Sequence, residues 1–213
     1  PFPADAFVAR LSPSGGGLRY STFLGGAADA DFANDFALDA YGGAAVAGET
    51  RSSDFPTTAG AYDTSFNGGF QDAYVTKLDL LPAGASAYGA STPGCAGVLA
   101  VGVTSWPQVG NASFALTCTN GPANGFGFLG FSTGGLATPL VFGGLAVWID
   151  PFAPFFFEVV VPSNALGAAE IPIAIPANPA LAGLQVFVQF AWPDGCASGG
   201  FSASNALAIT VQP

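Results

Sequence analysis

Apolar and small or polar side chains alternate in short runs along this chain, which is the pattern of β-strands. In the run Asp-Ala-Phe-Val-Ala-Arg-Leu at residues 5–11, Phe7, Ala9 and Leu11 occupy every second position. A period of two places such side chains on one face of an extended strand, whereas a helix needs a period near 3.6. A similar run at residues 18–24 ends at Gly25-Gly26. The first part of the chain is therefore predicted to consist of strands.

A hairpin is predicted next. Residues 35–39 and 44–49 are strand-like and flank Tyr41-Gly42-Gly43, and glycine supplies the backbone conformations that tight hairpin turns need. The stretch 52–58 is rich in Ser, Thr and Pro and indicates a loop.

The second part of the chain continues the strand pattern at short, regular spacing. Turn residues separate the runs, for example Asn120-Gly121-Pro122 and Pro193-Asp194-Gly195. About eight short strands punctuated in this way are typical of an antiparallel β-sandwich. The runs lie at residues 97–105, 113–119, 125–132, 144–149, 155–161, 168–175, 184–192 and 204–212.

Composition agrees with an all-β fold, in which less than a tenth of the residues are helical. The 213 residues include 30 Gly, 17 Pro and 20 Phe, with no Met and no His. Gly and Pro are the residues that cost most in helix interiors, and aromatic residues favour strands. We expect a β repeat at 1–78, a linker at 79–94 and a β-sandwich domain at 95–213.

An internal repeat stands out in the first part. The run at residues 5–11 returns 67 residues later as Asp-Ala-Tyr-Val-Thr-Lys-Leu at residues 72–78, with conservative differences. One repeat holds about four predicted strands, the size of a propeller blade.

Four separated motifs of this region occur in the order found in a known repeat. They are residues 5–11, Tyr-Ser-Thr-Phe-Leu-Gly-Gly at 20–26, the stretch 48–58, and the returning run at 72–78. Residues 5–78 thus resemble the bacterial seven-bladed β-propeller repeat (SBBP repeat). The resemblance implies one blade-like unit followed by the first strand of a second. Such repeats normally occur in arrays, and one blade cannot close a ring.

A second resemblance covers residues 88–213. The segments 88–95, 109–114, 175–183 and 204–212 resemble a C-terminal domain that ends many large secreted bacterial proteins. This likeness implies a place outside the cell and no particular activity. The chain starts at Pro1 without an initiator Met or a signal peptide, as expected of a mature, processed or truncated product.

Charge excludes two classes of partner. The chain has 4 Lys+Arg against 14 Asp+Glu, a formal net charge of −10, and no Lys or Arg follows Lys77. Nucleic acids and anionic membrane surfaces are bound through clustered cations, so neither is expected as a partner. The uncharged run 125–149 is broken by Gly and Pro into pieces too short to span a membrane.

Three cysteines predict one disulfide, as in secreted proteins. The bond is expected to include Cys95. Cys196 is the favoured partner, because it precedes the last predicted strand, and Cys118 is the alternative. Metal binding is the weaker interpretation, since the chain has neither a Cys-X-X-Cys pair nor a histidine.

A short acidic segment is a weak candidate for calcium. Asp29, Asp31, Asn34 and Asp35 lie within seven positions, and hard oxygen ligands of this kind bind Ca²⁺ in loops. The EF-hand pattern is missing, however, and Asp is common in turns for purely local reasons. A solvated acidic turn is therefore favoured over a calcium site, and no other cofactor is expected.

Catalysis is not expected. With no histidine, the usual base of serine and cysteine nucleophiles is missing. A carboxylate pair hydrolyses glycosides in other proteins, and Asp150 with Glu158 or Glu170 are the candidates in the predicted sandwich. Both glutamates lie in alternating strands where an outward, solvated position is ordinary.

The aromatic run Phe152 and 155–157 is expected to be mostly core, with Phe156 the least certain to be covered.

These observations predict an extracellular or cell-surface structural protein whose main partner is another copy of itself. An incomplete repeat exposes strand edges, and exposed edges pair with other chains. The expected assembly strand consists of Asp72, Ala73, Tyr74, Val75, Thr76, Lys77 and Leu78, which add to a neighbouring copy and generate a filament. The alternative is an adhesion module that binds carbohydrate or protein and belongs to a longer propeller protein.

Overall fold

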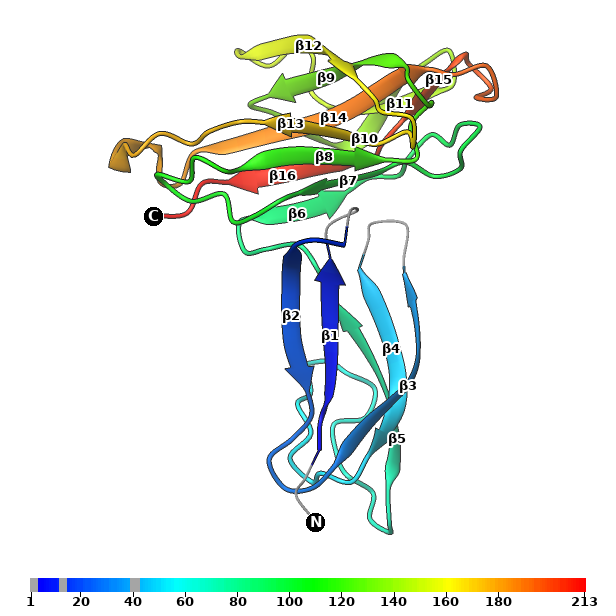
Figure 1. The fold of residues 1–213 in the computed structure, drawn as a ribbon, viewed down its shortest axis with the longest axis vertical. Coiled ribbons are helices and arrows are strands. Elements are labelled where there is room, and N and C mark those ends of the chain that lie inside the picture. Colours follow the sequence, from blue (N-terminus) through cyan, green and yellow to red (C-terminus); the bar gives the residue numbers. More distant parts are fainter. Residues whose placement is uncertain (1–3, 12–14, 39–42) are drawn as a thin grey trace. The chain divides into compact units, whose positions relative to one another are not determined.

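The computed structural model describes residues 4–11, 15–38 and 43–213, and shows an all-β protein whose paired strands are antiparallel (Figure 1). The prediction of the fold class is confirmed. The only helical element in the described part is a three-residue 3₁₀ turn, Pro179–Leu181. In the same residues, no helix is both long and apolar enough to cross a membrane. The chain divides into two compact units, and the boundary between them lies between Leu80 and Leu81.

The first unit contains two small sheets. β1 (Ala6–Leu11) pairs with β2 (Leu18–Leu24), and β3 (Asp31–Leu38), β4 (Ala44–Thr50) and β5 (Asp72–Leu78) form a sheet in the order β3-β4-β5. The predicted hairpin is present as β3 and β4, while Tyr41 and Gly42 of its turn lie outside the described residues.

A small apolar core holds these two sheets together. Ala44 and Val46 of β4 and Tyr74 of β5 are buried in it, and Ala6 and Val8 of β1 pack against the same cluster. Tyr74 lies opposite Gly48 across the β4–β5 ladder. A Cβ at Gly48 would approach the Tyr74 ring to within 2.8 Å, so the glycine leaves the room that the ring needs.

The second unit is a sandwich of two sheets with an added hairpin. The larger sheet has the order β12-β9-β14-β16-β6, with β15 also paired to β14, and the smaller has the order β13-β8-β7. β10 and β11 form the hairpin. The bounds are β6 Ala85–Tyr88, β7 Ala100–Val103, β8 Ala115–Thr119, β9 Phe126–Ser132, β10 Gly135–Phe142, β11 Leu145–Ile149, β12 Phe156–Pro162, β13 Ala169–Pro172, β14 Gln185–Pro193, β15 Phe201–Ala203 and β16 Ala206–Thr210.

The core of this unit lies between the two sheets. Leu116 of β8 faces Leu129, Phe190 and Trp192 of the large sheet, and all four are fully buried. The Phe190 and Trp192 rings are parallel, with centroids 5.4 Å apart. Alternation along β14 places Gln189 on the other face, where its side chain bonds the backbone of the β10–β11 hairpin at Ala146 and Trp148.

Eleven strands, β6 to β16, replace the eight predicted for this part of the chain. β6 lies within the predicted linker 79–94 and pairs with β16; its Ala- and Ser-rich sequence carries no strand signal of its own. β10 contains Pro139, which suggests a turn, yet its pairing with β11 is irregular between Gly135 and Leu140 and so accommodates the proline. β15 has only three residues.

Candidate functional site

The open edge of β5 is the main candidate site. β5 is the last strand of its sheet and pairs with β4 over its whole length, from Asp72 opposite Thr50 to Leu78 opposite Ala44. Among the strands that the structure describes, β4 is its one ladder partner. The predicted assembly strand 72–78 is therefore an edge strand with the same bounds as β5.

A groove of about 540 Å³ runs beside this strand. Its wall includes every residue from Asp72 to Lys77. Because successive side chains of a strand point to opposite faces, a groove that touches all of them follows the edge of the strand. The opposite wall consists of residues 50–67, which connect β4 to β5 and are rich in Ser and Thr.

Hydrogen bonds fix the shape of that opposite wall. Asp63 accepts hydrogen bonds from the backbone N–H and the hydroxyl of Ser65 and from the side-chain amide of Asn67. The bond from Asn67, followed by those from Ser65, lowers the pKa of the Asp63 carboxyl to about 2. The Asn67 N–H donates to the Asp72 carboxylate at the start of β5. The groove is thus bounded by an ordered loop, and sequence reasoning had identified only that residues 52–58 form a loop.

The acidic segment behaves as a structural brace. Asp31 is 1% exposed, and its carboxylate accepts hydrogen bonds from the Gly26 N–H and the Ser52 hydroxyl, at 2.7 and 2.8 Å. Burial alone raises the pKa of Asp31, but hydrogen bonds from Thr50, Gly26 and Ser52 outweigh it, so that the pKa is lowered. Asp54 accepts from the N–H groups of Ala27 and Ala28.

Asp29 joins this brace through its backbone, which bonds the Ser52 hydroxyl, but the side chains of the other members of the proposed calcium set do not take part in it. Asp29 and Asp35 are exposed, and each accepts a hydrogen bond from the N–H that follows it, of Ala30 and Phe36 respectively. Asn34 lies at the irregularity of the β3–β4 ladder. Among the described residues, the aspartates of this segment do not form a group of three close enough to share a metal ion. Asp29 lies in a bend before β3, whereas Asp31, Asn34 and Asp35 lie in β3 itself, so the expectation of a solvated acidic turn is wrong for these three residues.

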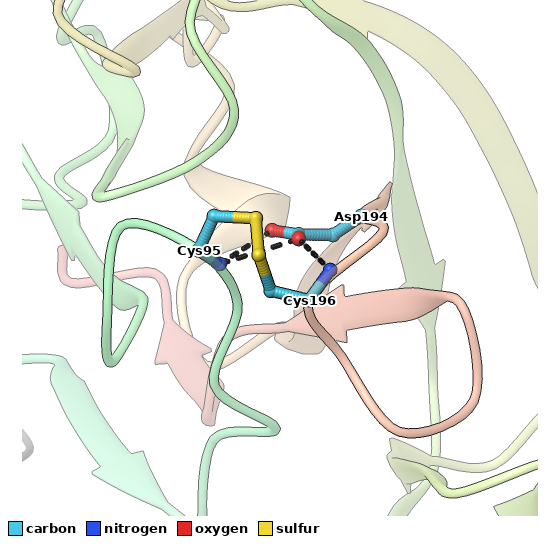
Figure 2. A group of neighbouring side chains, drawn as sticks. All are labelled: Cys95, Asp194 and Cys196. Atoms are coloured by element: carbon cyan, nitrogen blue, oxygen red, sulfur yellow. Dashed lines mark hydrogen bonds between the residues drawn. A yellow bond between two sulfur atoms is a disulfide. The ribbon is translucent and has the colours of Figure 1, made fainter.

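A disulfide and a carboxylate form a compact knot in the second unit (Figure 2). The bond joins Cys95 to Cys196, the pairing favoured from the sequence, and leaves Cys118 as a buried free thiol. Asp194 is buried and accepts hydrogen bonds from the Cys95 and Cys196 N–H groups (Figure 2). One carboxylate therefore holds the backbone at both ends of the bond. Sequence reasoning identified Asp194 only as part of a turn.

The knot has chemical consequences. The sulfur atoms of Cys95 and Cys196 and a carboxylate oxygen of Asp194 lie within 4.8 Å of one another, but both sulfurs are in the disulfide. Disulfides form and persist in oxidising compartments, so the bond indicates a non-reducing environment. Burial raises the pKa of the Cys118 thiol, which keeps it protonated and unreactive.

Aromatic residues expected in the core lie at the surface of the second unit. Phe152, Phe155, Phe156 and Phe157 are 80%, 62%, 37% and 42% exposed, so the expectation that most of them are covered is wrong. β12 is an edge strand of the large sheet; its Val161 reaches the core, whereas Phe157 stacks on Phe131 with ring centroids 4.7 Å apart.

Phe156 lines a small apolar cavity on the opposite face of the same sheet. The cavity has a volume of about 220 Å³ and lies beneath the β10–β11 hairpin. Phe128, Phe142 and Phe201 also line it, and Glu158 is its one charged lining residue. Glu158 is exposed on β12, Glu170 is exposed on β13 of the other sheet, and Asp150 accepts a hydrogen bond from the Phe152 N–H. Glu158 and Glu170 therefore lie on strands of different sheets.

No family model, curated protein or solved structure matches this chain. What the protein does is therefore argued from its own geometry.

Proposed function

We propose that this chain is a non-enzymatic structural protein, secreted or held at the cell surface, that assembles with other copies of itself through β-strand edges. The observation that carries the proposal is the β5 edge, which faces a groove of about 540 Å³ instead of another strand.

An edge strand offers a row of N–H and C=O groups to an incoming strand. Addition of a strand forms backbone hydrogen bonds, and the alternating side chains select the partner. The outward residues of β5, Ala73, Val75 and Lys77, include no proline and a single charge, so the edge carries few of the features that block pairing. The repeat supplies a second strand of nearly the same sequence, β1, which has β2 as its ladder partner.

Two further observations support the proposal. The disulfide fits an extracellular setting. The first unit also exposes large apolar side chains, among them Phe7, Phe23 and Phe36 at 67%, 79% and 67%. A protein that remains a monomer seldom exposes large apolar patches, whereas a subunit of an assembly covers them with its neighbours.

One observation favours a second candidate function, an adhesion module for carbohydrate or protein. The aromatic cavity beneath the β10–β11 hairpin offers Phe128, Phe142 and Phe201 to a ligand, and aromatic faces suit sugar rings and apolar side chains. A glycan array tests this alternative directly, with Phe201→Ala as the variant expected to lose any binding.

Two proline variants test the edge. Consecutive N–H groups of β5 point to opposite edges, so in Val75→Pro and Thr76→Pro one proline removes a bond to β4 and the other removes a donor from the open edge. The proline that removes a bond to β4 lowers the melting temperature. The proline at the open edge leaves folding nearly intact, because proline is tolerated at an outer edge, and it raises the protein concentration needed for filaments by at least about tenfold.

Light scattering and negative-stain microscopy of the two variants provide the measurement. Filaments of unchanged length and critical concentration in the folded proline variant would show that the β5 edge is not the contact. A stable monomer of the unaltered protein at high concentration would refute the self-assembly proposal and leave the adhesion module as the better explanation.

A further inference from the structure

The two copies of the repeated strand bury opposite faces. Phe7 of β1 corresponds to Tyr74 of β5, and Val8 corresponds to Val75. Tyr74 is 9% exposed while Phe7 is 67% exposed. Conversely, Val8 packs against the core of the first unit while Val75 is 81% exposed. Since the two sequences are nearly the same, the side chains that β5 buries are exposed in β1, and the side chains that β1 buries are exposed in β5.

The covered faces meet in one contact within the molecule. Ala6 and Val8 of β1 pack into the cluster formed by Val46 of β4 and Tyr74 of β5. The Val8-type face of one repeat therefore already lies against the Tyr74-type face of the next. This internal contact defines which two surfaces fit together.

The two sheets that make this contact each have a second face, which is exposed in the first unit. The hairpin face is the outer surface of β1 and β2, where the Phe7–Phe23 and Leu11–Leu18 pairs lie across the ladder. All four side chains are more than half exposed. The hairpin face carries no charged residue, since Ala9 and Ser21 complete it.

The sheet face is the outer surface of β4 and β5. It consists of Ala45, Ala47 and Glu49 with Ala73, Val75 and Lys77, which all lie opposite one another in register. The three alanines and the valine are exposed. This surface is flat and mostly apolar, and therefore suits close approach by a second sheet.

We propose that the hairpin face of one copy packs on the sheet face of a second copy and so repeats the internal β1–β2 to β4–β5 contact between molecules. The contact is heterologous, because two different surfaces meet, and a pair of copies keeps one unused surface of each kind. Contacts of this type generate open assemblies unless the rotation closes a ring. The inference rests on the proposed self-assembly and adds a face contact to the edge contact.

The apolar content of the hairpin face agrees with a protein partner. Exposed contiguous patches beyond a few hundred Å² mark interaction sites on soluble proteins. The sheet face has Lys77 and Glu49, and Asp35 of the neighbouring strand β3 lies opposite Ala47 on the same side of the sheet, so this side carries one cation and two acids and its net charge is small. The occupant is identified by the repeat itself, since a Val8-type face is the surface that covers a Tyr74-type face in this molecule.

A mixing experiment tests the face contact apart from the edge contact. All proteins are the full chain with the β5 proline substitution, Val75→Pro or Thr76→Pro, that blocks the open edge and leaves the protein folded. They are studied at high concentration by light scattering. Phe7→Ser with Phe23→Ser disables the hairpin face, and Ala47→Arg disables the sheet face. Leu166→Ser is the matched control, because Leu166 is an 84% exposed apolar side chain of the second unit.

The expected result is specific to a heterologous contact. The edge-blocked parent and the Leu166→Ser control form short oligomers, and each face variant alone is a monomer. A one-to-one mixture of the two face variants gives a dimer containing one copy of each and nothing larger, because only one live surface of each kind remains.

Two results would overturn the face contact. Self-association of the Ala47→Arg protein alone would show that the hairpin face pairs with itself, and a mixture that stays monomeric would show that the two faces do not meet. In either case the proline pair still reports on the edge, so failure of the face contact is distinguished from failure of self-assembly through edges.

Discussion

The two units of this protein bury their apolar residues to very different degrees. The second unit has a core of fully covered large side chains, among them Leu99, Leu129, Phe190 and Trp192 at 0% exposure, and a disulfide that spans a sequence separation of 101. In the first unit, buried apolar residues are few, and Phe7, Phe23 and Phe36 are mostly exposed. The second unit has the features of a self-sufficient domain.

The difference concerns how the sheets of each unit are covered. A sheet needs a covering layer to be stable, and the two-stranded β1–β2 sheet covers only part of the three-stranded sheet. Under the proposed self-assembly, neighbours cover the apolar surface of the first unit, whereas the second unit has a covered core of its own.

The largest expected effect comes from the core of the second unit. Trp192→Ala removes a fully buried ring that stacks on Phe190, and changes of this kind cost about 3–5 kcal/mol. The matched change in the first unit, Phe23→Ala, removes a 79% exposed ring and is expected to change stability by less than about 0.5 kcal/mol. Denaturant unfolding followed by fluorescence measures both. Equal losses from the two changes would contradict the contrast between the units.

Loss of the disulfide is expected to be nearly as large. Replacing Cys95 and Cys196 by Ser removes a bond of the type that contributes about 2–5 kcal/mol. Asp194 then remains buried with its two backbone donors, so the loop is loosened without a new unpaired charge. We expect a lower melting temperature for the second unit and no change in the first. Differential scanning calorimetry separates these outcomes, and an unaltered transition would show that Asp194 alone holds the knot.

The first unit is expected to be the acid-sensitive one. The folded-state pKa of Asp31 lies below the ordinary value of 3.8, so its carboxylate stabilises the fold above that pH and the stabilisation is lost as the pH falls through the folded value. Asp31→Asn removes the charge that accepts the Gly26 and Ser52 bonds, at a cost of about 1–3 kcal/mol. Stability measured between pH 6 and pH 3 should fall in the parent and stay flatter in the variant. Asp29→Asn, at an exposed position, is the control.

Local patterns were sufficient for much of this fold. The repeated run predicts β1 and β5, because alternation and the seven matched positions are properties of neighbouring residues. The hairpin of β3 and β4 follows from its glycine turn for the same reason. β6 is different, since its Ala-Ser-Ala-Tyr sequence becomes a strand only through pairing with β16, more than a hundred residues away in the chain.

The candidate sites depended even more on distant residues. Among the four members of the acidic segment, Asp31 alone is buried, because Ser52 and Thr50 reach it from β4 and the turn beyond. Nothing in the segment itself distinguishes Asp31 from Asp29. Phe155 and Phe157 are exposed at or beside an edge strand of the large sheet, and the place of a strand in its sheet is not encoded by local periodicity. Pairing of Cys95 with Cys196 could be argued only from the expected strand order.

The smallest expected effect is a change in the labelling of Cys118, which reports on the second unit alone. All three cysteines of the chain lie in that unit, and Cys118 is its one free thiol, fully buried between the sheets. Since burial raises its pKa, alkylation requires opening of the sandwich and not merely a higher pH. After exposure to a pH below the folded-state pKa of Asp31, where protonation weakens the brace, and return to pH 8 for a brief alkylation, Cys118 should stay unlabelled. Cys118 should react fully once denaturant unfolds the second unit, and mass spectrometry counts the modified thiols. Labelling that begins with loss of the first unit would mean that the two units unfold together, and the contrast between a self-sufficient sandwich and a partner-dependent repeat would then be lost.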